Sequence, residues 1–168
     1  MTFLLRPAAA LSLILSGALF GFFYAWICST MWGLDAADPR VAITAMQAMN
    51  ASVRNFVFAP AFFGTPFVAA LAALLLLWAG QKRSAAAFAA SAVVYGVLGM
   101  GLTMAVNVPM NEALALTPVP QDLEQAAEIW REYSASWQVW NQVRTVTSGL
   151  AFLVSVIGLL TLDRPDAA

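Results

Sequence analysis

The sequence predicts an all-α integral membrane protein, a four-helix bundle with helical extensions that form a cap on the non-cytoplasmic side. Two observations carry this prediction. Of the 168 residues 61% are apolar and only 10% are charged, and residues 7–34, 55–81, 84–111 and 145–162 contain no charged side chain. A helix needs about 20 apolar residues to cross the hydrocarbon core, and a helix satisfies its own backbone in lipid. Residues 1–168 are therefore expected to form a single domain with spans at about 8–31, 56–80, 85–107 and 143–162.

The first span, residues 8–31, is expected to be a retained anchor. It is longer than the apolar core of a signal peptide, and no clear small-residue cleavage site follows it. Gly17 and Gly21 form a GxxxG pair, which lets another helix approach closely. Trp26 and Trp32 lie near the far end, where indole rings favour the membrane interface.

The second span is expected to be preceded by an amphipathic helix. Asp38 is a good N-cap and Pro39 suits the first helical position. The helix that starts there carries Arg54 on a polar face and is predicted to run into the second span. Pro60 and Pro66 fall inside the apolar run and should kink or interrupt it.

The third and fourth spans are expected to meet the cap at their outer ends. The third closes on the sequence NVPMN at residues 107–111, where Pro109 should make the chain bend and restart. After a stiff loop at residues 117–120, Asp122 is the expected N-cap of one long last helix. Such a helix would be about 60 Å long, twice the bilayer core, so its polar first part should stand outside the membrane.

The distribution of basic residues predicts the orientation. Arg6, Lys82, Arg83 and Arg164 fall on one side, whereas the loops of the other side are rich in acids. Positive-inside counting places both termini in the cytoplasm. We expect a multi-pass protein of the plasma membrane. The expected partner is the lipid bilayer. The net charge of −1 gives no support for nucleic acid as a partner.

Polar side chains from three helices are expected to converge at one level of the membrane. Trp137, Trp140, Asn141 and Arg144 share one helix face by their offsets of three, four and seven. The full set comprises Asn50, Arg54, Asn107, Asn111, Glu112, Trp137, Trp140, Asn141 and Arg144. A positive pocket with aromatic walls suits a flat apolar molecule that develops an oxyanion, with Glu112 as proton acceptor.

A structural interpretation of the same residues stays open. Intramembrane Asn and Arg also hydrogen-bond neighbouring helices or reach the interface, and tryptophans form interface belts. The chain has no histidine, so haem, copper and typical non-haem iron sites lose their usual ligand. No Walker or Rossmann glycine pattern is present. The sequence therefore predicts no metal site and no bound cofactor.

Four motifs resemble those of a family of small four-helix membrane proteins that includes the fungal anthrone oxygenases. They are GFFYAW at 21–26, AMQAMN at 45–50, NVPMN at 107–111 and WNQVRT at 140–145. Many relatives have a histidine where this chain has Gln142. The resemblance implies oxidation of an anthrone-like phenolic substrate to a quinone by O₂, without an obvious bound cofactor.

On that reading Glu112 is the base, Arg54 and Arg144 stabilise the anion, and Asn141 completes the catalytic set. Asn50, Asn107, Asn111, Trp137 and Trp140 would contact the apolar aromatic small molecule. The alternative is a non-enzymatic membrane binding or assembly protein, so whether the chain is an enzyme stays open at this point. A small transporter would require a homodimer, which the sequence allows but does not predict.

Overall fold

The computed structural model describes residues 2–162, so Arg164 lies outside the described residues. The chain is built from helices, and residues 2–162 contain no strand. The elements are η1 (Thr2–Leu4), α1 (Leu5–Ala25), η2 (Trp26–Thr30), α2 (Met31–Asp35), α3 (Pro39–Ser52), α4 (Phe58–Trp78), α5 (Lys82–Val93), η3 (Val94–Gly101), η4 (Thr103–Asn107), α6 (Val108–Leu116) and α7 (Leu123–Leu160). The segments η2, η3 and η4 are π-helical turns inside longer rods.

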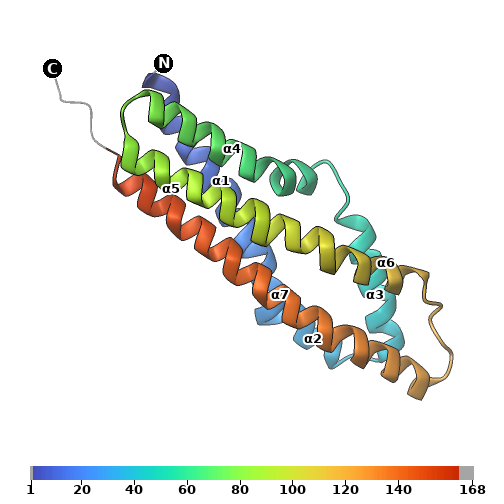
Figure 1. Cartoon of the computed structure of the whole chain (residues 1–168). Coiled ribbons are helices and arrows are strands. Elements are labelled where there is room, and N and C mark those ends of the chain that lie inside the picture. Colours follow the sequence, from blue (N-terminus) through green and yellow to red (C-terminus); the bar gives the residue numbers. More distant parts are fainter. Residues whose placement is uncertain (1, 163–168) are drawn as a thin grey trace.

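Four rods run side by side (Figure 1). They span Leu5–Asp35, Phe58–Trp78, Lys82–Leu116 and Leu123–Leu160, and each is long and apolar enough to cross a membrane. α1 and α5 both pack against α4 and α7, so the rods close into a ring. Both described chain ends lie at one end of the bundle, where Ser84 and Thr161 are hydrogen-bonded. These findings confirm the predicted four-helix membrane bundle.

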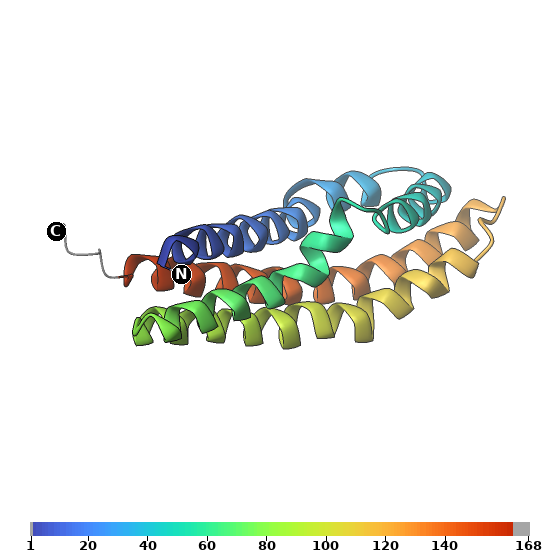
Figure 2. The same ribbon diagram turned by 90° about the horizontal axis from the view of Figure 1, so that it is seen from above.

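The predicted helical cap is present at the opposite end. There α3 lies alongside α2, α6 and the first half of α7 (Figure 2). The cap has its own apolar core, which includes Met31, Ile43, Met46, Leu114 and Trp130. Because this cluster is separate from the two clusters of the bundle, the cap is a packed extension and not a frayed helix end.

Two helix starts follow the predicted capping chemistry. The Asp38 carboxylate accepts from the Arg40 backbone N–H at 2.9 Å, with Pro39 at the first position of α3. The side-chain and backbone hydrogen bonds from Arg40 lower the pKa of Asp38 to about 2. Asp122 caps α7 by accepting from the Gln125 N–H at 2.8 Å. Both caps fix where a cap helix begins.

The prediction that α3 runs into the second span is wrong. α3 ends at Ser52, and residues 53–57 form a turn before α4 begins. The Asn55 side chain holds this turn, because its Oδ1 accepts from the N–H groups of Val57 and Phe58. A side-chain amide that satisfies the first donors of α4 competes with continued helix. Pro66 lies inside α4 and does not interrupt it, so of the two expected effects of this proline only a kink stays a prediction.

The helix does not restart at Pro109 as expected. The third rod stays helical from Lys82 to Leu116, and Pro109 sits in the first turn of α6. A proline ring in a regular helix would clash with the carbonyl four residues earlier, here that of Ala105. The π-helical segment η4, which contains Ala105, directly precedes α6. Its wider turn moves the Ala105 carbonyl away from the proline ring, so the clash is avoided.

One glycine contact gives a test of the bundle packing. A Cβ on Gly158 of α7 would lie 3.0 Å from both Ala87 and Phe88 of α5, whereas a Cβ on Gly21 meets nothing within 4 Å. We expect Gly158→Val to lower the free energy of unfolding by about 1–3 kcal/mol, because the helices must separate. Thermal unfolding in detergent measures this, with Gly21→Val as the matched control. Equal destabilisation by both variants would contradict this packing.

Candidate functional site

The centre of the candidate site is a buried arginine in α7. Arg144 is only 5% exposed, and its Nε donates to Asn141 Oδ1 at 2.9 Å. Its guanidinium carbon lies 4.5 Å from the ring centroid of Phe23 and 4.9 Å from that of Trp137. The two terminal nitrogens have no hydrogen-bond partner, and no carboxylate within residues 2–162 forms an ion pair with them.

The charge of Arg144 is incompletely compensated by these contacts. Removing an ion from water costs several kcal/mol in a protein, even after relaxation. Each cation–π contact returns about 0.5–2 kcal/mol, and a hydrogen bond to a charged group about 1.5–3 kcal/mol. The terminal nitrogens still need acceptors that the described chain does not supply. The arrangement therefore suits an additional electron-rich group, such as water or a bound oxyanion.

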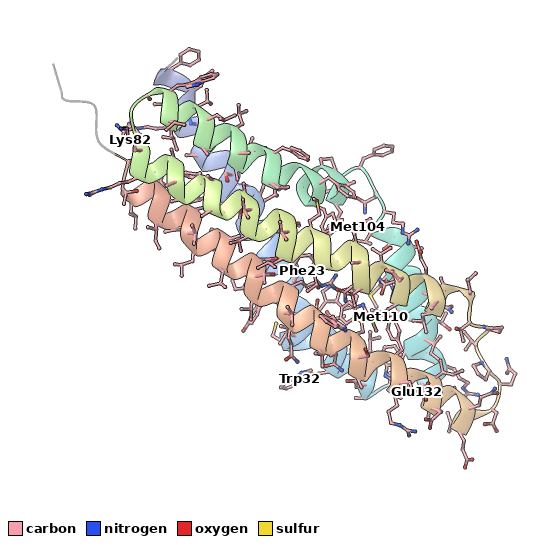
Figure 3. All side chains as sticks on the ribbon, viewed as in Figure 1. Phe23, Trp32, Lys82, Met104, Met110 and Glu132 are labelled. Carbon is pink, nitrogen blue, oxygen red and sulfur yellow. The ribbon has the colours of Figure 1, made fainter. Side chains whose placement is uncertain are left out.

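A hydrogen-bond network in the cap meets this arginine at Trp137. It lies in the part of the bundle between Phe23 and Met110 in Figure 3. Asn111 Oδ1 accepts from both Trp137 Nε1 at 2.9 Å and the Tyr133 hydroxyl at 2.8 Å. The Tyr133 hydroxyl in turn accepts from Asn50 Nδ2 at 3.4 Å. On the other side of Arg144, Asn141 Nδ2 donates to the Phe23 carbonyl at 3.2 Å. The structure thus brings together five of the nine sequence-predicted residues: Asn50, Asn111, Trp137, Asn141 and Arg144.

Asn107 is completely buried. Within residues 2–162 neither its Nδ2 nor its Oδ1 makes a hydrogen bond. The position of Asn107 along the bundle follows from two hydrogen bonds between the third rod and α7. Trp137 donates to Asn111, and the Thr147 hydroxyl donates to the Leu98 carbonyl. In antiparallel helices this register places Asn107, one turn from Asn111, at the level of residues 138–141 of α7. The Arg144 guanidinium reaches the same part of the helix, because it lies over the Trp137 ring. An orphan carboxamide at that level indicates an unseen partner.

Besides Asn107, three predicted residues lie outside this network. Arg54 and Glu112 form an ion pair at 3.2 Å on the outside of the cap, with their side chains 61% and 58% exposed. The structure therefore does not place them beside Arg144 as the sequence suggested. Trp140 is half-buried on α7, and its ring makes no aromatic contact within the described chain.

Three residues of the site were not singled out from the sequence. Phe23 and Tyr133 form its walls, and the only signal for Phe23 was the aromatic run at 21–26. Asp35, at the end of α2, accepts hydrogen bonds from Trp130, Ser134 and Gln138 of α7 at 2.9, 2.7 and 2.9 Å. In the sequence Asp35 is marked only as one of the acids on the side opposite the basic turn. Its three donors share one face of α7, which is a signal that helical spacing could have given.

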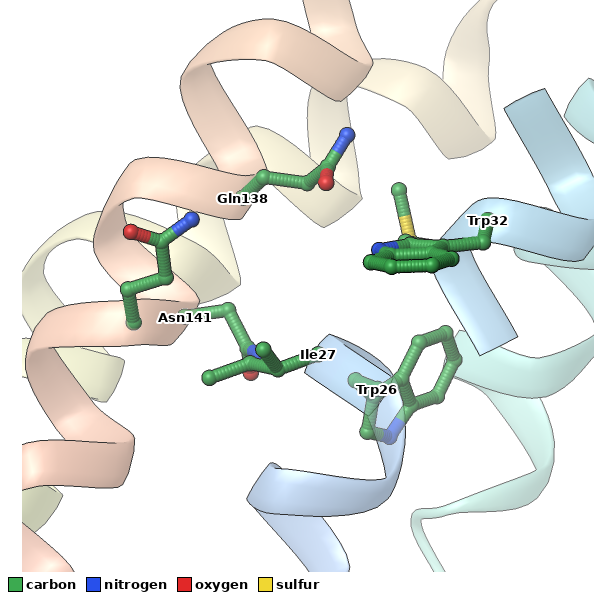
Figure 4. Close-up of a pocket in the computed structure, with 7 residues that line it drawn as sticks. Trp26, Ile27, Trp32, Gln138 and Asn141 are labelled. Carbon is green, nitrogen blue, oxygen red and sulfur yellow. The ribbon is translucent and has the colours of Figure 1, made fainter. Parts of the chain in front are cut away.

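A small pocket opens beside the network (Figure 4). It has a volume of about 40 Å³ and is lined by Trp26, Ile27, Met31, Trp32, Gln138, Asn141 and Gln142. One water molecule takes up about 30 Å³ in the liquid. The pocket is therefore large enough for one or two water molecules but not for a polycyclic ring system. Larger ligands would have to displace side chains. The π-helical segment η2 forms one wall, and such turns are frequent at functional sites.

No group of three or more His, Cys, Asp or Glu side chains in the described part of the chain is placed to hold an ion. The site offers instead a guanidinium, carboxamides, a phenol and indole rings.

Comparisons with known proteins give one match. A protein-family model described as Anthrone oxygenase matches residues 54–154, which include Glu112 and the α7 part of the network. No curated protein and no solved structure matches the chain.

Proposed function

The chain belongs to the anthrone oxygenase family, and from this premise we propose that it oxidises an anthrone-like or other apolar phenolic substrate with O₂ and without a bound cofactor. The observation that carries the proposal is the buried, unpaired guanidinium of Arg144 between two aromatic rings. A preorganised cation in a dry site stabilises an oxyanion far more than the same cation in water.

The proposed chemistry balances with O₂ as the only co-reactant. Loss of a proton from C10 of an anthrone gives an anion with its charge on the C9 oxygen. This anion passes one electron to O₂, and the resulting radical and superoxide combine to form a C10–O bond. The peroxide takes up one proton. Loss of the remaining C10 hydrogen as a proton, with cleavage of the O–O bond, then gives the quinone and one water.

Three residues have distinct roles in this proposal. Arg144 stabilises the C9 oxyanion, and Asn141 orients Arg144 through the bond to its Nε. Glu112 is the proposed base, because it is the one acid in the set of polar residues that the sequence predicts. To reach a substrate, its carboxylate would have to leave the ion pair with Arg54.

The remaining predicted contacts concern substrate binding and location. Asn50, Asn107 and Asn111 supply polar contacts, while Trp137 and Trp140 supply aromatic ones. A flat ring system would have to widen the small pocket beside Asn141. We propose the plasma membrane as the location, with both termini in the cytoplasm and the cap outside, because Lys82 and Arg83 lie at the end opposite the cap.

A non-enzymatic binding or assembly role is the second candidate, and one observation favours it. The network joins α1, α3, α6 and α7, so it also holds the cap on the bundle. The test is oxygen uptake by the purified full chain in detergent with anthrone. Oxidation predicts one O₂ consumed for each quinone formed, above the rate without protein. Absence of uptake by folded protein with several anthrones would favour the second role.

Replacement of Glu112 tests the proposed base. We expect Glu112→Gln to lower kcat by about 10²–10⁴-fold, because a positioned general base contributes about that factor. Glu128→Gln is the matched control, since Glu128 also forms an exposed ion pair with an arginine, here Arg131. Quinone formation followed by absorbance measures the rates. Equal kcat values for the two variants would remove Glu112 from the mechanism.

A further inference from the structure

We propose that Arg144 and Asn107 form a binding site for a small monovalent inorganic anion, which occupies the protein when no organic substrate is bound. This inference is independent of the proposed oxidation. It follows from charge and hydrogen bonding alone, and it would hold for a binding protein as well as for an enzyme.

The first argument is the charge of Arg144. The three ion pairs within residues 2–162 join Arg40 to Asp38, Arg54 to Glu112 and Arg131 to Glu128, and all lie on exposed surface. None of them involves Arg144, which is almost fully buried. A buried charge in a membrane helix is normally paired or lines a wet cavity. A bound anion supplies the missing counter-charge and the missing acceptor for the terminal nitrogens.

The second argument is the unpartnered amide of Asn107. This side chain is 0% exposed and lies, by the helix register, opposite residues 138–141 of α7, where the Arg144 guanidinium covers Trp137. Its Nδ2 is a free donor that can join the guanidinium in holding an anion. Protein polar atoms at such depth are normally satisfied by protein, water or an ion. The unpartnered amide of Asn107 and the buried cation of Arg144, which has no ion-pair partner within residues 2–162, thus point to one ligand.

The aromatic surroundings of the guanidinium define the ligand class. The rings of Phe23 and Trp137 cover it, which leaves room for only a small ligand at its terminal nitrogens. An anion must lose most of its water to enter, so weakly hydrated ions should bind best. We expect iodide to bind more tightly than chloride, and the strongly hydrated sulfate not to bind.

Iodide quenching of tryptophan fluorescence tests the site directly, because Trp137 lies 4.9 Å from the guanidinium. The purified full chain in detergent is titrated with iodide, with gluconate holding the ionic strength constant. We expect a saturable quenching component on top of the linear collisional one. Arg144→Met should abolish the saturable component, and Asn107→Leu should weaken iodide binding about 10-fold.

A second measurement covers the case in which Arg144→Met fails to fold. Millimolar iodide should then raise the thermal unfolding midpoint of the wild type, and by less in Asn107→Leu. The proposal would be overturned by two results together. Quenching would be linear and identical in the wild type and Asn107→Leu, and iodide would not change the thermal unfolding midpoint of either protein. Anthrone turnover without an iodide effect would reject only the anion site, whereas an iodide effect without turnover would reject only the oxygenase function.

Discussion

Replacing Arg144 with alanine is expected to lower kcat for anthrone oxidation by about 10²–10³-fold. This is the usual cost of removing one group that stabilises a developing oxyanion. The structure offers no substitute cation, because Arg54 is turned to the outside of the cap. Oxygen uptake and quinone absorbance, measured on the same detergent-solubilised samples, give the rates.

Two further variants separate a site role of Arg144 from a structural one. Arg144→Lys keeps the charge but loses the planar fork and its stacking on Phe23 and Trp137, so it should recover only part of the activity. Arg131→Ala removes an exposed arginine of the same helix and should leave kcat unchanged. A folded Arg144→Ala protein with wild-type turnover would contradict the mechanism. Loss of folded protein in all Arg144 variants, with normal Arg131→Ala, would favour the assembly role.

The central part of the site was predictable because helical spacing alone determines it. Trp137, Asn141 and Arg144 lie at offsets of four and seven, and the structure buries all three on one face of α7. Trp140 lies at the edge of that face and is only half-buried. The same rotation of about 100° per residue explains why Glu112 points away. Once Asn111 faces α7, its direct neighbour is turned out of the bundle.

The features that the sequence did not predict depend on local competition between backbone geometries. The break between α3 and α4 requires the Asn55 side chain to outcompete the helix for two N–H groups. The uninterrupted third rod requires π-helical turns before Pro109. The periodicity of apolar residues predicts neither the Asn55 turn nor the π-helical turns, because neither of them changes the order of apolar and polar residues. Fold class, capping and the bundle were therefore accessible from the sequence, whereas these junctions were not.

Replacing Asp35 with leucine is expected to destabilise the cap by about 2–3 kcal/mol. Its carboxylate accepts from Trp130 and Ser134, which are both nearly buried, and from Gln138. Removing the acceptor leaves buried donors unpaired, and an unpaired buried donor costs more than the net value of its hydrogen bond. The measurement is thermal unfolding in detergent combined with hydrogen exchange of α2 and α3.

Asparagine at the same position should cost much less than leucine. Both Trp130 and Ser134 donate to one oxygen of Asp35, so the carbonyl oxygen of an asparagine can keep these two bonds. Only the bond from Gln138 to the second oxygen is lost. Glu124→Leu, an exposed acid of the same cap, controls for the added leucine and should change stability little. If Asp35→Leu were as stable as Glu124→Leu, the three bonds would not hold α2 to α7. Their loss should also loosen Met31, which links this contact to the wall of the pocket beside Asn141.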